Sequence, residues 1–223
     1  MSGARYSMKG QINLGNKRPF LSWSGGTVLA AAAVVLLTFA AFVHPFLAIN
    51  EPVSADVLVV EGWVPDYVLD AAVVEFARGH YTRLLVSGLE FEKGDADFAE
   101  GSDAARSARR LAGKGVDRSL IEACPAPATG WDRTSSMARA VRDRLPALNM
   151  KPKGVNLVTL GPHARQTRLA YRRMLDPGIL VGVISIPKDD YVPARWWASG
   201  AGIKKTTKDF AGWAKELLLG PRT

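Results

Sequence analysis

The sequence predicts an α/β domain built on a mainly parallel β-sheet and preceded by one membrane-spanning helix. Two observations support this prediction. Short apolar runs alternate with segments of helical periodicity over residues 50–223, and a long uncharged segment comes before them. A chain of 223 residues has room for one domain of ordinary size and an appendage. Apolar residues make up 48% and charged residues 22%, so the composition is that of a folded protein.

The membrane-spanning helix is predicted from 32 residues without a formal charge, Pro19–Asn50. The centre of this segment, Val28–Val43, is apolar apart from Thr38. The segment exceeds the roughly 20 residues that a helix needs to cross a bilayer, and a buried core helix of this length would have a polar face. We assign the span to residues 25–49, and the lipid bilayer is the first expected partner.

The flanking charges predict the orientation of this helix. Four basic residues and no acidic residue precede it, whereas six acidic residues come before the next cation, Arg78. The positive-inside rule therefore places a basic tail, residues 1–24, in the cytoplasm and the domain, residues 50–223, outside it. A cleaved signal peptide is the alternative, although Phe46 stands where cleavage after Ala48 would need a small residue.

The charge balance and the single cysteine exclude several classes of protein. The 29 basic and 21 acidic residues give a net charge of +8, but four of the basic residues precede residue 51, so the remainder carries only +4. We therefore expect no nucleic-acid partner. Cys124 alone supports neither an internal disulfide nor a cysteine-cluster zinc site. The sequence has no Walker A loop, G-x-G-x-x-G fingerprint or G-x-S-x-G elbow, and it identifies no cofactor.

The first half of the domain reads as two strand–helix pairs. The continuous apolar run at residues 57–60 predicts a buried strand, and residues 66–79 follow with apolar side chains at helical spacing. Gly79 is expected to end this helix. A second short strand is predicted at residues 84–86, and a helix with an outward basic face at residues 103–114.

A third strand and a third helix come next. The strand is predicted at residues 120–124 and is expected to be short, because Pro125 follows it at once. The helix is predicted at residues 134–145, with Thr134 as its amino-terminal cap and Pro146 as its stop.

The last elements complete the alternation. Apolar runs predict strands at residues 155–160 and 180–186, with a helix between them that ends at Leu175. The closing helix is expected to present one apolar face, made of Phe210, Trp213, Ala214, Leu217 and Leu218. Strands that alternate with helices in this way predict a three-layer, Rossmann-like domain with right-handed crossovers.

Candidate site residues follow from this fold, because ligands of an open parallel sheet bind beyond the carboxyl ends of the strands. The polar and glycine residues at those ends are Glu61, Gly62, Trp63, Ser87, Gly88, Thr159, Gly161 and His163. Thr134, at the start of the third helix, is expected to face the same crevice.

The stretch around His163 carries the predicted chemistry. A helix amino end attracts anions, and Arg165 and Arg168 are expected to add positive charge there. His163 is the expected catalytic acid or base, and Glu61 is expected to orient a water or a metal. The alternative is that His163 caps the helix, the arginines form a solvated face and Glu61 is only a polar strand end.

The acidic segment at residues 90–103 contains six acids and one cation, Lys93. We expect it to form a mobile lid over the crevice. Calcium binding through Asp95, Asp97 and Glu100 is an alternative, but their spacing differs from an EF-hand loop, and we assign no metal site.

Three blocks of the domain resemble the ElyC/SanA/YdcF family of envelope-associated α/β proteins. They are VLVVEGW with the later LLVSG, the helix start Thr134-Ser135-Ser136-Met137-Ala138, and LVTLGPH followed by arginines. The second block is similar to the family's T-x-x-N-A and the third to its V-T-S-x-x-H-x-x-R-A segment. Met137 stands where the family has Asn, and Leu160 where it has Ser.

This resemblance implies a single-pass protein of the inner (cytoplasmic) membrane with a periplasmic domain, linked to the assembly of peptidoglycan or another envelope polysaccharide. We expect the domain to bind or process an anionic precursor, such as a phosphorylated lipid-linked sugar. The alternative is a non-catalytic assembly factor. It would dock on membrane biosynthetic enzymes through its sheet edge or through Trp196 and Trp197.

Overall fold

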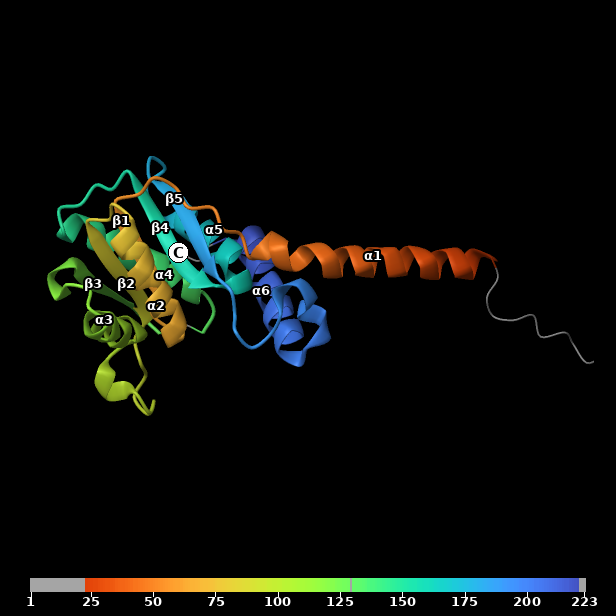
Figure 1. Ribbon diagram of the computed structural model, residues 1–223, viewed down its shortest axis with the longest axis horizontal. Helices are drawn as coiled ribbons and strands as arrows, with labels where there is room; N and C mark the ends of the chain where they lie inside the picture. The colour runs from red at the N-terminus through yellow and green to blue at the C-terminus, as the bar shows by residue number, and fades with distance from the viewer. Residues whose placement is uncertain (1–22, 129, 221–223) are drawn as a thin grey trace, which may run out of the picture. The chain divides into compact units, whose positions relative to one another are not determined.

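The computed structural model describes residues 23–128 and 130–220 (Figure 1). The chain forms two compact units that meet between Phe39 and Ala40. Helix α1 (Trp23–Leu47) is apolar, and its stretch Gly25–Leu47 is long and apolar enough to cross a membrane. Most of the basic tail predicted at residues 1–24 lies outside the described residues.

The domain has a five-stranded sheet in which every neighbouring pair is parallel, in the order β3-β2-β1-β4-β5. Its strands are β1 (Val57–Glu61), β2 (Arg83–Leu89), β3 (Ile121–Ala126), β4 (Gly154–Leu160) and β5 (Leu180–Ile186). Its principal helices are α2 (Asp66–Arg78), α3 (Asp103–Gly113), α4 (Arg133–Ala147), α5 (Ala164–Met174) and α6 (Gly200–Leu219). Short 3-10 turns include η3 (Gly161–His163) and η4 (Pro193–Ala198).

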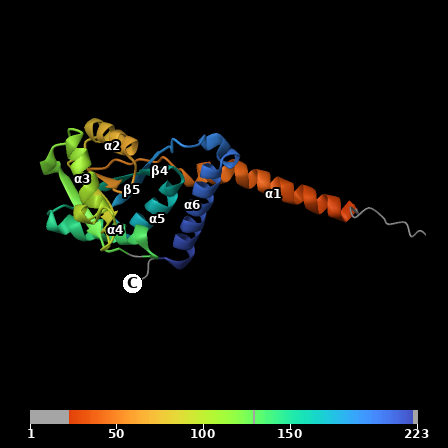
Figure 2. The same ribbon diagram turned by 90° about the horizontal axis from the view of Figure 1, so that it is seen from below.

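Two apolar clusters make the sheet the middle of three layers. Alternate side chains of β1 point to opposite faces, as expected for a strand. Val57 and Val59 pack with α4 and α5, whereas Leu58 and Val60 pack with α2 and α3. Figure 2 shows α2 and α5 on opposite sides of the sheet. The structure confirms the predicted three-layer, Rossmann-like α/β fold.

Three predicted details of the third strand and the third helix were wrong. Strand β3 continues through Pro125 to Ala126, because β3 lies at the edge of the sheet, where a residue without a backbone N–H is tolerated. The N-cap position of α4 is Asp132, whose side chain makes no capping hydrogen bond, so Thr134 lies inside the helix and does not cap it. Helix α4 also runs past Pro146, which falls in the last turn and removes only one backbone hydrogen bond.

The face of α6 that packs against the domain also differs from the prediction. Its fully buried residues are small or polar, namely Gly202, Thr206, Asp209 and Glu216. Leu218, assigned to the buried face, is 79% exposed. The reason is that α6 packs against α5 and η3, at the polar end of the domain.

The end of α1 is part of the domain's own packing. Val43 and Leu47 are buried in a cluster with Tyr191 and Trp196. The indole Nε1 of Trp196 donates a hydrogen bond to the carbonyl of Ala40 over 2.7 Å. The second unit therefore begins inside the helix, with no intervening linker.

Candidate functional site

The register of the sheet aligns a row of side chains near its carboxyl end. In sheet order this row, called here the strand-end row, consists of Cys124, Ser87, Glu61, Thr159 and Ser185. Each residue after Cys124 lies two positions beyond a core residue that faces α4 and α5, so the row shares that face. The strands thus bring three predicted site residues, Ser87, Glu61 and Thr159, side by side.

Glu61 is the charged member of the row and is only 1% exposed. A buried carboxylate needs hydrogen-bond donors, and two threonine hydroxyls supply them. Thr159 donates from the neighbouring strand, and Thr167 of α5 lies 3.3 Å from Oε1 and 3.4 Å from Oε2. Glu61 is therefore held in place by the fold and does not turn to solvent.

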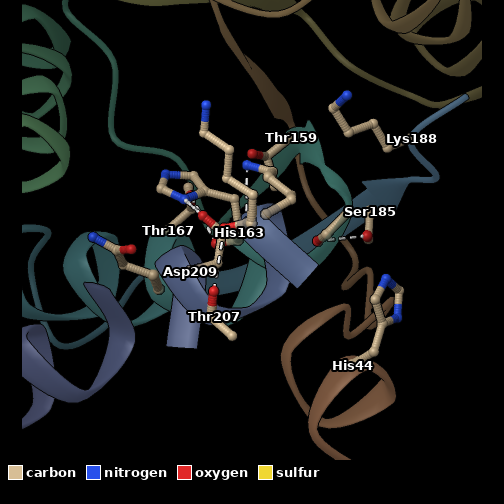
Figure 3. Close-up of polar contacts among 12 residues, drawn as sticks. His44, Thr159, His163, Thr167, Ser185, Lys188, Thr207 and Asp209 are labelled. Atoms are coloured by element: carbon tan, nitrogen blue, oxygen red, sulfur yellow. Dashed lines mark hydrogen bonds and ion pairs between the residues drawn. The ribbon is translucent and has the colours of Figure 1, made fainter. Parts of the chain in front are cut away.

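His163 lies at the end of η3, between two carboxylates. Its Nδ1 is 3.2 Å from Oδ1 of Asp209 on α6, and its Nε2 is 3.8 Å from Oε1 of Glu61. Figure 3 shows the His163 and Asp209 side chains turned toward each other. The indole of Trp63 meets the imidazole edge-on, with 5.3 Å between the ring centroids.

The charge state of Asp209 decides how His163 is oriented. Burial disfavours the charged form of Asp209, but the hydrogen bond from His163, the charge of the His163 ring and then the positive charge of Lys205 outweigh that effect and lower the pKa of Asp209. Lys205 Nζ is 2.9 Å from Oδ2. An ionised carboxylate only accepts hydrogen bonds, so Nδ1 of His163 carries a proton. Nε2 is then the ring nitrogen that can exchange a proton with a ligand.

A cavity of about 390 Å³ opens beside His163. Trp63, Trp131, Thr134, Met137 and Gln166 are among its lining residues, and its four cationic residues are Arg133, Lys205, Lys208 and Lys215. Three carboxylates also line it, but Asp209 and Glu216 are buried and already bound to other side chains. The cations therefore make the cavity suited to an anion.

The predicted glycines shape the backbone around the site. A Cβ atom on Gly62 would lie 2.6 Å from the carbonyl oxygen of Asp103, and one on Gly88 would lie 2.3 Å from the nitrogen of Ala104. Both glycines thus let the start of α3 approach the ends of β1 and β2. Gly161 has φ +54°, a value that favours glycine, at the turn that leads to His163.

Arg165 and Arg168, expected to bind an anion, do not line the cavity. The guanidinium of Arg165 lies over the ring of Phe46, 4.0 Å from its centroid, and donates to the Phe46 carbonyl. Arg168 pairs with Glu51 and donates to the carbonyl of Val181 over 3.0 Å. These two side chains fasten the end of α1 and the segment after it to the domain.

The cavity's cations come instead from α4 and α6, which the sequence argument did not include. Lys205, Lys208, Asp209 and Gly212 recur at spacings of three and four, so they share one face of α6. That spacing is visible in the sequence. It was missed because the buried face of α6 was inferred from the apolar residues alone.

The acidic segment does not cover the cavity, and none of residues 90–103 lines it. Its carboxylates pair with cations of α3 instead. Arg106 binds Asp97 and Asp103, and Arg109 Nη2 is 3.5 Å from Oε2 of Glu100. Among residues 23–128 and 130–220, no three His, Cys, Asp or Glu side chains are grouped to hold a metal.

Ser87 and Cys124, two residues of the row, have side chains of the kinds that act as nucleophiles. Ser87 and Cys124 are both buried, and neither lines the cavity beside His163. Burial, with a smaller effect of Glu122, raises the pKa of the Cys124 thiol to about 12. A thiol with such a pKa stays protonated, so Cys124 is no nucleophile at neutral pH.

No protein-family model and no curated protein matches the chain. The site provides an imidazole oriented by Asp209, a buried carboxylate held by two hydroxyls, and a cavity lined by four cations. Together these groups can hold an anion and move a proton beside it.

Proposed function

We propose that the chain is a membrane-anchored enzyme of envelope biogenesis that binds a phosphate-bearing precursor and cleaves it by proton transfer at His163. The observation that carries this proposal is the position of His163, between Asp209 and Glu61 at the edge of a cavity lined by cations. The resemblance to the ElyC/SanA/YdcF family points to the same setting, the assembly of peptidoglycan or another envelope polysaccharide.

The proposed reaction is hydrolysis at phosphorus. Lys205 and Lys208 hold the non-bridging oxygens, and Nε2 of His163 takes a proton from the attacking water. As the new P–O bond forms, the P–O bond to the leaving group breaks. His163 then returns the proton to the leaving oxygen. Glu61, 3.8 Å from Nε2, stabilises the imidazolium that exists between the two transfers.

Packing at the end of α1 supports an uncleaved anchor over a signal peptide. Val43 and Leu47 are buried in the domain, and Ala40 accepts the hydrogen bond from Trp196. Cleavage after Ala48 would remove all three from the fold and expose their partners. An anchored domain outside the cytoplasm would meet substrates that cannot leave the bilayer, such as a phosphorylated lipid-linked sugar.

A non-catalytic binding role is the second candidate. Met137 lines the cavity at the position where the resembled family carries Asn. A thioether there donates no hydrogen bond to a substrate, which favours binding without turnover. In this version the cavity would recruit the precursor for membrane biosynthetic enzymes.

The test uses the full chain in detergent with farnesyl diphosphate as a soluble lipid-phosphate probe. We expect release of inorganic phosphate, and we expect His163→Gln to slow it by about 100-fold or more, as for loss of a general acid–base group. The matched control is Arg172→Gln on the exposed side of α5, which should leave the rate unchanged.

Two results would contradict this proposal. Phosphate release at an unchanged rate in His163→Gln would show that His163 is not the acid–base group of the reaction. Binding of the probe without any phosphate release, and its loss in Lys205→Gln, would support the non-catalytic role instead.

A further inference from the structure

Exposed apolar side chains gather in the segment that contains η4 and the start of α6. Val192, Trp197 and Ile203 are all exposed, and Trp197 keeps 45% of its surface accessible. Arg195 and Lys204 are exposed cations in the same segment. Tryptophan and aliphatic side chains interleaved with cations are typical of segments that lie at a membrane interface.

This segment is attached to the end of α1. Trp196, next to Trp197, donates to the carbonyl of Ala40 over 2.7 Å, and the two indole rings are 6.1 Å apart. The hydroxyl of Tyr191 is 3.0 Å from Nε2 of His44. The residues around η4 therefore lie against Ala40 and the next helical turn of α1, which contains His44.

The length of α1 before Ala40 is close to the thickness of the hydrocarbon core. The 18 residues from Trp23 to Ala40 extend about 27 Å as a helix, so a bilayer boundary near Ala40 leaves enough helix to cross it. The helix continues directly into the domain, because Val43 and Leu47 are already buried there. Whatever packs on Ala40 is thus held at the membrane surface by the chain itself.

We propose that residues 192–204 form a membrane-contacting surface that rests on the bilayer in which the chain is anchored. Trp197, Val192 and Ile203 lie in the interfacial zone, where tryptophan is enriched. Arg195 and Lys204 face the phosphates of anionic lipid headgroups. This inference rests on the anchoring proposed above and adds a second contact between the domain and the membrane.

The surface also connects the membrane to the cavity through α6. Ile203 and Lys204 lie in the first turn of this helix, and the cavity residues Lys205 to Lys215 follow along about 15 Å of its length. The proposed surface and the cavity lysines are therefore joined by a single helix.

The test attaches an environment-sensitive fluorophore to single cysteines of the full chain in vesicles. Sites are Trp197→Cys and Ile203→Cys on the surface, Val74→Cys on the exposed side of α2 as matched control, and Val35→Cys within the apolar helix. Cys124 stays unlabelled because it is buried and its pKa is raised to about 12. Quenchers are lipids that carry a spin label in the headgroup or in the acyl chain.

We expect the headgroup quencher to act on the labels at 197 and 203 but not on the label at 74, and the acyl-chain quencher to act at 35. Equal, weak quenching at 197, 203 and 74 with strong quenching at 35 would overturn the surface and leave the anchor intact. No quenching at 35 would overturn the anchor, and the surface with it. Arg195→Gln combined with Lys204→Gln should weaken quenching at 197 in anionic vesicles. Unchanged quenching would show that the two cations do not contribute to the membrane contact.

Discussion

Two buried carboxylates flank His163, one from a strand and one from a helix, and their surroundings differ. Glu61 ends β1, is 1% exposed and is bound by the hydroxyls of Thr159 and Thr167. Asp209 lies on α6, is 3% exposed and is bound by His163 and Lys205. Neutral hydroxyl donors from the core bind Glu61, whereas side chains that line the cavity bind Asp209.

This difference separates residues that stabilise the fold from residues that are available to bind a ligand. The strand-end row belongs to the sheet, so changes there should act mainly on stability. The α6 face is packed against the finished domain, so changes there should act mainly on binding. Each variant below tests this division by comparing the two regions.

The largest expected effect is at Glu61. Glu61→Ala should lower the free energy of unfolding by about 3 kcal/mol, because it leaves the buried hydroxyl of Thr159 without its acceptor and opens a cavity. Glu61→Gln, which keeps an acceptor oxygen, should cost less. Urea titration of the full chain in detergent measures both, and an Ala variant as stable as the wild type would contradict the structural role of the row.

Two glycines provide a matched pair with a smaller effect. A Cβ on Gly88 would meet the backbone nitrogen of Ala104 at 2.3 Å, so Gly88→Ala should cost about 2 kcal/mol. A Cβ on Gly212 would be equally close to Oε1 of Gln166, but that side chain can move. Gly212→Ala should therefore leave stability nearly unchanged while narrowing the cavity and weakening phosphate binding. A larger loss of stability in Gly212→Ala than in Gly88→Ala would contradict the division between the two regions.

The smallest expected effect is the pH dependence due to Asp209. Its pKa in the folded domain is lowered from the ordinary value of 3.8, so its contribution to stability is present above that value and is lost as the pH falls through the lowered pKa. As the pH falls below about 5, wild type should lose stability more steeply than Asp209→Asn. Parallel curves from urea titrations at each pH would show that the ion pair with His163 and Lys205 does not stabilise the fold.

The same comparison explains which features the sequence revealed. Each strand is an apolar run with a clear end, so the polar residue that follows, such as Glu61 or Thr159, is conspicuous and its place in a parallel sheet is known. Asp209 gives no such signal, because a carboxylate on an amphipathic helix is normally read as solvent-facing. Its burial depends on α6 packing against η3 and α5, a tertiary contact that helical periodicity does not encode.

The arginines of α5 were misplaced for a related reason. Arg165 follows His163 by two residues, so the sequence suggests a shared site. On a helix, however, residues two apart point in different directions. Arg165 turns to Phe46 at the end of α1, while the ring of His163 turns to Asp209.

The central claim is that an anion binds in the cavity beside His163, and NMR of the histidine rings tests it most directly. Inorganic phosphate is added to the full chain in detergent, and the His163 signals are assigned with His163→Gln. We predict that phosphate shifts the His163 resonances and leaves those of the exposed His80 unchanged, with binding about tenfold weaker in Lys205→Gln and unaltered in Arg172→Gln. His163 resonances that stay fixed at saturating phosphate, or an affinity unchanged by Lys205→Gln, would contradict the claim.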